Sequence, residues 1–169
     1  MKKLLTMVAV LATACVMFLG CPQEATTDEG PAPAFTITYK DSAQWAAPTF
    51  TVKDDWKTLE VEFDKEYADI QFCVISDAVE AEQSWGTSYF SIYPKAEVKT
   101  TLDIAAQLEI ANDSGKTLKD NGATKVEKIS IQNKTASGFK VKVMSAKVTK
   151  ADGSVENVTP AGDWGSEVK

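Results

Sequence analysis

The sequence lacks histidine, and no arginine occurs anywhere along it. Without histidine, a Ser-His or Cys-His catalytic pair cannot be assembled, and a zinc site would lack its commonest ligand. Without arginine, bidentate recognition of phosphate loses its preferred side chain. The two absences therefore argue against the common nucleophilic hydrolases, zinc proteins and phosphate-binding proteins.

The start of the chain has the features of a secretory signal. Two lysines begin it, and an uncharged apolar run follows from Leu4 to Leu19. The segment Phe18-Leu19-Gly20-Cys21 resembles the lipobox of bacterial lipoproteins, particularly spirochaetal ones. We therefore expect a signal peptide over residues 1–20, a lipid on Cys21, and a lipid-anchored location in the bacterial cell envelope, either periplasmic or surface-exposed.

Two alternatives to this signal remain open. Cleavage before Cys15 is one, although it would leave the apolar segment Val16 to Leu19 exposed. The other is an uncleaved membrane anchor, for which the apolar run is slightly short. In each case the domain that follows faces outward from the cell.

The remainder of the chain divides into a tether and one domain. Residues 21–34 are rich in proline, alanine, threonine and acidic residues, which predicts a disordered spacer after the lipidated cysteine. Residues 35–169 are enough for one domain with a single core. Cys73 is the sole cysteine of this domain, so packing and not an internal disulfide must stabilise it.

Acidic residues outnumber basic ones in this sequence. The net charge of −6 becomes −8 once the two lysines at positions 2 and 3 leave with the signal. This charge repels nucleic acid and anionic headgroups, so we expect no nucleic-acid partner and membrane attachment through the lipid anchor only. Neutral ligands are the natural candidates.

The hydrophobic pattern of the domain is that of short β-strands separated by turns. We expect strands near residues 35–40, 49–53, 59–64, 70–76, 89–93, 99–105, 126–133, 139–148 and 155–158. Helix-like spacing over residues 107–118 predicts one short irregular helix, and a phase slip at Met144-Ser145 predicts a β-bulge. The pattern indicates an all-β fold, an antiparallel β-sandwich of the jelly-roll type.

The aromatic stretch from Ser84 to Tyr93 is the most distinctive of these segments. In an extended strand, Phe90 and Ile92 share one face, which suits a core. Tyr89, Ser91 and Tyr93 share the opposite face. That second face is aromatic and hydroxylated, as expected of a flat surface for a polar, partly apolar ligand.

Several short motifs occur in a familiar order: Leu59-Glu60-Val61-Glu62-Phe63, Ile129-Ser130-Ile131-Gln132-Asn133 and a last valine-rich strand, Lys142 to Val148. This order resembles that of carbohydrate-binding modules with the galactose-binding-like jelly roll, which are appended to bacterial glycanases. The resemblance implies carbohydrate as the partner and, with no catalytic module attached, a free-standing tethered binder. Such modules often hold a structural calcium ion, for which Asp54, Asp55, Asp152 and Asp163 offer oxygen ligands.

A sugar site needs flat aromatic rings for the ring faces and amides for the hydroxyl rim. Our candidates for the rings are Trp85, Tyr89 and Tyr93, and those for the rim are Gln71 and Gln132, with Ser130 as a further hydroxyl. Trp45 is either a further aromatic of this site or a lid over the core. The alternative throughout is that these are outward residues on ordinary strands, where aromatic residues are common.

Two further tryptophans and the acidic residues complete the survey. We expect Trp56 to fill the core and Trp164 to anchor the C-terminal tail, although Trp164 can also be read as a binding residue. No pair of carboxylates stands out for glycoside hydrolysis, so a small glycanase is disfavoured and no enzyme is expected. The sequence thus predicts non-catalytic binding of a neutral, β-glucan-like saccharide with no cofactor, and it leaves open whether a structural calcium ion is bound; the alternative function is binding of a protein partner or an envelope scaffold.

Overall fold

A computed structural model describes residues 30–78, 91–112 and 115–169. Residues 31–169 form a compact unit of their own. Several sequence predictions lie outside the described residues: the signal, the lipidated Cys21, most of the tether, and Trp85, Tyr89 and Phe90. No helix within the described ranges is long and apolar enough to span a membrane.

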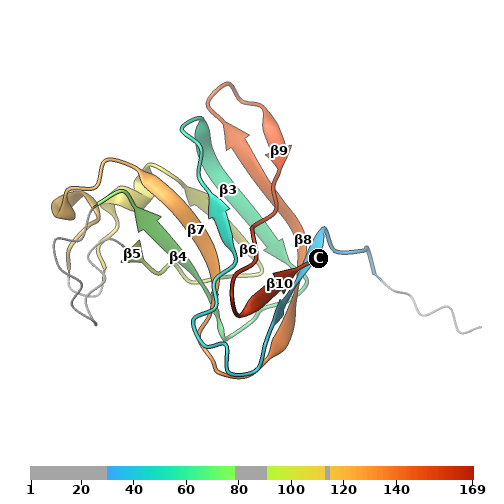
Figure 1. Ribbon diagram of the computed structural model, residues 1–169. Helices are drawn as coiled ribbons and strands as arrows, with labels where there is room; N and C mark the ends of the chain where they lie inside the picture. Colours follow the sequence, from blue (N-terminus) through green and yellow to red (C-terminus); the bar gives the residue numbers. More distant parts are fainter. Residues whose placement is uncertain (1–29, 79–90, 113–114) are drawn as a thin grey trace, which may run out of the picture. The chain divides into compact units, whose positions relative to one another are not determined.

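The described domain consists of two antiparallel sheets (Figure 1). The strands of the first sheet are β1 (Phe35–Tyr39), β3 (Trp56–Phe63), β6 (Lys99–Asp103), β8 (Phe139–Lys150), β9 (Val155–Asn157) and β10 (Ser166–Val168). Those of the second are β2 (Thr49–Thr51), β4 (Ile70–Ser76), β5 (Ser91–Ile92) and β7 (Val126–Asn133). The first sheet has the order β10-β1-β8-β3-β6, with β9 paired to β8, and the second has the order β2-β7-β4-β5.

Strands β1 to β8 are wound in the order of a jelly roll. Four of them pair as β1-β8-β3-β6 in one sheet, and the other four pair as β2-β7-β4-β5 in the other. Each of these pairings is antiparallel. The all-β sandwich predicted from the spacing of short alternating segments is therefore confirmed.

The alternation of side chains builds one core between the sheets. In β1, Phe35, Ile37 and Tyr39 are buried while the threonines between them are partly exposed. The inward side chains of both sheets join a single cluster, whose fully buried members include Leu59, Val61, Phe72, Val74, Ile129 and Ile131. Trp56 is 7% exposed at the start of β3, so its predicted place in the core is confirmed.

The predicted β-bulge is present in β8. Glu62 of β3 lies opposite Ser145, but the next residue, Phe63, lies opposite Val143. Met144 is therefore the extra residue on the bulged strand. The shift lets both Val143 and Ala146 point into the core, which explains the change of phase in the sequence.

The predicted irregular helix over residues 107–118 is wrong. Two 3-10 turns, Ala106–Glu109 and Lys119–Asn121, replace it, and an antiparallel bridge joins Ala111 to Thr117 between them. Asn112 accepts a hydrogen bond from Lys116 N through its side chain at 3.1 Å, and Gly115 has a φ of 75°. The turn chemistry of asparagine and glycine thus overrides the apolar spacing.

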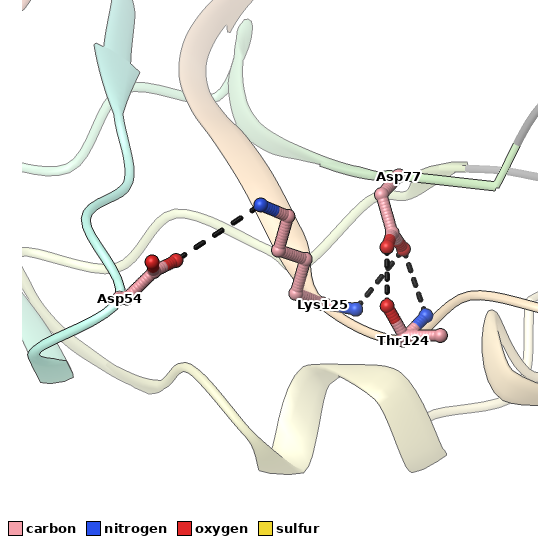
Figure 2. Close-up of polar contacts among 4 residues, drawn as sticks. All are labelled: Asp54, Asp77, Thr124 and Lys125. Atoms are coloured by element: carbon pink, nitrogen blue, oxygen red, sulfur yellow. Dashed lines mark hydrogen bonds and ion pairs between the residues drawn. The ribbon is translucent and has the colours of Figure 1, made fainter.

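A carboxylate latch joins the end of β4 to the start of β7. Asp77 accepts hydrogen bonds from the backbone of Thr124 (2.7 Å) and Lys125 (3.0 Å) and from the Thr124 hydroxyl (Figure 2). These donors lower the pKa of Asp77 from 3.8 to about 2. The Lys125 ammonium lies 4.0 Å from Asp54, which adds a weak, exposed ion pair.

Candidate functional site

The two predicted amides meet on the outer face of the second sheet. Gln71 of β4 and Gln132 of β7 are directly opposite in the strand register. The Gln71 amide nitrogen donates to the Gln132 side-chain oxygen at 2.6 Å. Their inward neighbours are core residues, so both amides project from the side of the sheet that faces away from the core.

The amide pair belongs to a longer row that crosses the sheet. On one side Gln71 bridges to Lys95, just beyond β5. On the other side Ile131 N donates to Pro48 O and Asn133 N donates to Ala46 O, so Gln132 lies opposite Ala47. We call Ala47, Gln132, Gln71 and Lys95 the amide row. A surface hollow of about 350 Å³ adjoins its Lys95 end, with walls formed by Glu66, Lys95, Glu97, Val98 and Lys99.

The neighbouring row is hydroxylated but largely covered. Thr49 and Ser130 share a hydrogen bond of 2.8 Å between their hydroxyls, and Ser130 lies opposite Cys73. Ser130 is 1% exposed and Ser91 is 2% exposed, so the prediction that they face a ligand is wrong. Their short side chains contact neighbouring residues of the sheet instead of solvent.

Cys73 is buried, as predicted, although it follows the outward parity of β4. Burial raises the pKa of its thiol to about 11, and hydrogen bonds from Ser91 and Tyr93 partly oppose that rise. The thiol is therefore protonated at neutral pH and acts as a small packing group in the sheet face.

Exposed aromatic rings lie at both sides of the amide row. Tyr93 directly follows β5 and is 46% exposed. Trp45, on the opposite side, is 53% exposed, and its backbone N–H donates to Asn133 O at 2.8 Å. Trp45 is therefore not a lid over the core. The structure brings Gln71 and Gln132 together, with Tyr93 and Trp45 at the two sides.

Trp164 is also exposed, at 67%, so its predicted use as an anchor for the tail is wrong. Asp163 anchors the tail instead. Its carboxylate accepts hydrogen bonds from Ala47 N at 2.6 Å and from the Ser166 hydroxyl at 2.6 Å. Gly165 completes the contact, because a Cβ there would lie 2.7 Å from the Cβ atoms of Ala43 and Ala46.

The outer faces of the two sheets differ in their charged residues. Facing positions of the first sheet pair acid with lysine, as in Glu60 opposite Lys147 and Glu62 opposite Lys99. The outward positions that are in register on the second sheet are Thr49, Thr51, Gln71, Cys73, Ile75, Ser91, Lys128, Ser130 and Gln132. The acidic residue among the described strand residues of this sheet is Glu127, which is exposed at the register shift of β7. This face therefore offers neutral hydrogen-bonding groups at the Gln71–Gln132 pair, with the charged side chains of Glu127 and Lys128 near the start of β7.

The aspartates considered for calcium do not converge in the part of the chain that the structure describes. Asp54 faces Lys125, Asp152 accepts from Ser154 N at 2.8 Å, and Asp163 binds the tail. Among the described residues, no group of three or more carboxylate, thiol or imidazole side chains is arranged to hold a metal ion.

Comparison of the chain with protein-family models, with curated proteins and with solved structures gave no match. The features that sequence reasoning missed are therefore visible in the geometry alone. The chief one is that Trp45 and Trp164 are carried by segments that pack together. Its only trace in the sequence is the small residues beside each tryptophan: Ala43, Ala46 and Ala47 near the first, and Gly162 and Gly165 near the second.

Proposed function

We propose that this chain is a lipid-anchored protein of the bacterial cell envelope that binds a neutral, β-glucan-like saccharide without catalysing a reaction. One observation carries the proposal. The outer face of the second sheet carries the Gln71–Gln132 amide pair, and the exposed residues Tyr93 and Trp45 lie in the segments that follow β5 and precede β2. Amides suit the hydroxyl rim of a sugar, and flat rings suit its C–H face.

The mechanism is reversible association through stacking and hydrogen bonding. In the unbound protein the two amides bond to each other, so each still has hydrogen-bonding capacity to offer a ligand. Every sugar hydroxyl must lose water to bind, and the surface is open. We therefore expect modest affinity, on the order of micromolar to millimolar.

The test is titration of the full chain with a panel of soluble neutral and charged glycans, followed by tryptophan fluorescence and calorimetry. Gln71→Ala and Gln132→Ala should each weaken binding about 3- to 10-fold, the loss expected for one hydrogen bond. Lys147→Ala, on the outer face of the first sheet, is the matched control and should bind like the wild type. Failure to bind any neutral glycan at millimolar concentration would refute the proposal and favour a protein partner.

The envelope location rests on the lipobox-like segment and has its own test. In a bacterial host supplied with a labelled fatty acid, Cys21→Ser should abolish lipid incorporation, whereas Cys15→Ser should retain it. If lipid incorporation depends on Cys15, the anchor is on Cys15 and not on Cys21. If the wild-type chain incorporates no lipid, the protein is an uncleaved or a soluble form.

A further inference from the structure

The C-terminal tail extends the second sheet beyond β2. Thr49 and Ala161 form an antiparallel bridge, with Thr49 N donating to Ala161 O at 2.8 Å and Ala161 N donating to Thr49 O at 2.9 Å. Two residues along each segment, Ala47 N donates to the Asp163 carboxylate. The tail thus lies beside β2, and Asp163 continues the amide row past Ala47.

Trp164 directly follows the end of this extended row, and the backbone at Trp164 and Gly165 accepts hydrogen bonds from Lys40. The Lys40 ammonium donates to Trp164 O at 3.4 Å, and Lys40 N donates to Gly165 O at 3.0 Å. Gly165 packs against Ala43 and Ala46, the neighbours of Trp45. A side chain on a fixed backbone loses less entropy when it binds.

Neither tryptophan contributes much to the stability of the fold. Trp45 has a φ of 69°, a left-handed conformation that costs a bulky residue about 1–2 kcal/mol relative to a helical or extended one. Trp45 is 53% exposed and Trp164 is 67% exposed, so burial recovers little of the hydrophobic free energy available to an indole. Strain at an exposed aromatic residue points to a role in recognition.

We infer that Trp164 is a ligand-binding residue and that the ligand is an extended saccharide chain lying across the strands. From Lys95 through Gln71, Gln132 and Ala47 to Asp163 the row crosses four strand spacings, or about 19 Å. This length exceeds a mono- or disaccharide. The chain would contact the amide pair at its centre and the Trp45 and Trp164 rings at one end. The inference rests on the proposed function and adds to it a preference for length and a new residue.

The end of the domain that carries Trp45 and Trp164, which we call the tryptophan tip, is also well placed to meet a long polymer. Trp45 follows the end of β1, and Trp164 precedes β10, which pairs with β1. The start of β1 lies beside the C-terminus, because Thr36 and Lys169 exchange backbone hydrogen bonds (Figure 1). The chain therefore enters the domain at the opposite end of β1, away from the tryptophan tip.

The experiment compares the affinity of the full chain for cello-oligosaccharides from the disaccharide to the hexasaccharide. Affinity should rise with length and then level off. Trp164→Ala should weaken hexasaccharide binding about five- to tenfold and leave disaccharide binding unchanged, whereas Trp164→Phe should restore most of the loss. Val155→Ala removes an apolar side chain that is 62% exposed in β9 and serves as the matched control.

The outcomes separate the two proposals. Binding at every length with equal affinity, or full hexasaccharide affinity in Trp164→Ala, would overturn this inference and leave the amide-row site intact. If no oligosaccharide or polymeric β-glucan binds, the proposed function fails and this inference fails with it. Thermal unfolding of each variant checks the fold, and the exposed position of Trp164 predicts an unchanged midpoint.

Discussion

The contact between the tail and the β1–β2 loop gives the sharpest test of the packing. Replacing Gly165 by alanine places a methyl group 2.7 Å from both Ala43 Cβ and Ala46 Cβ, about 1 Å closer than carbon atoms normally approach. Such overpacking costs about 1–3 kcal/mol. The loss of glycine's freedom in the unfolded chain offsets about 0.4–1 kcal/mol of this. We expect a net loss of about 1–2 kcal/mol in the free energy of unfolding.

The assay is urea and thermal unfolding of Gly165→Ala beside Gly30→Ala, where the added Cβ meets nothing within 4 Å. A loss of about 1–2 kcal/mol lowers the thermal midpoint of a domain of this size by about 3–8 °C, and the control should keep the wild-type midpoint. Because the displaced segment carries Trp45, glycan affinity should also fall in Gly165→Ala. Wild-type stability in Gly165→Ala would refute the close packing of the tail against the β1–β2 loop.

Three other predictions address single groups. Asp77→Asn should lower the urea midpoint at pH 7. Because the pKa of Asp77 is lowered from 3.8 to about 2 in the folded protein, the difference in midpoint between wild type and variant should shrink as the pH falls from about 4 to 2. A difference that stays constant over this range would contradict the latch. Tyr39→Phe removes a hydroxyl that donates to Ile131 O at 2.5 Å and should cost about 1–3 kcal/mol in urea unfolding, since a buried carbonyl loses its partner; no change would contradict that bond. In a chain with serine at positions 15 and 21, Cys73 should react with a thiol reagent at pH 8 at least about 100-fold more slowly when folded than in denaturant, because its pKa is raised to about 11; equal rates would refute its burial.

The fold was largely readable from local pattern. Alternation in segments such as Phe35–Tyr39 identifies strands, because one buried face imposes a period of two on a strand. The change of phase at Met144 located the bulge for the same reason. The segment 107–118 misled us because its apolar spacing fits a helix, while Asn112 and Gly115 satisfy the backbone locally as a turn.

The candidate site was readable only in part. Parity on each strand identified Gln71 and Gln132 as outward amides, but it does not say which strands are neighbours. Their 2.6 Å hydrogen bond follows from the pairing of β4 with β7, two strands far apart along the chain. Parity was also insufficient for Ser91 and Ser130, since exposure depends on what surrounds a short side chain as well as on the face that it occupies.

Residue order along the chain by itself determined the strands, the single core and the uncharged character of the amides, because these depend on local periodicity and side-chain chemistry. Tertiary structure alone decided that the tail lies beside β2 and that the segment with Trp164 packs against the segment with Trp45. The reason is physical: the contact depends on Asp163 finding Ala47 N, and on the absence of a Cβ at Gly165 where Ala43 and Ala46 approach. No local pattern records an approach between segments more than a hundred residues apart.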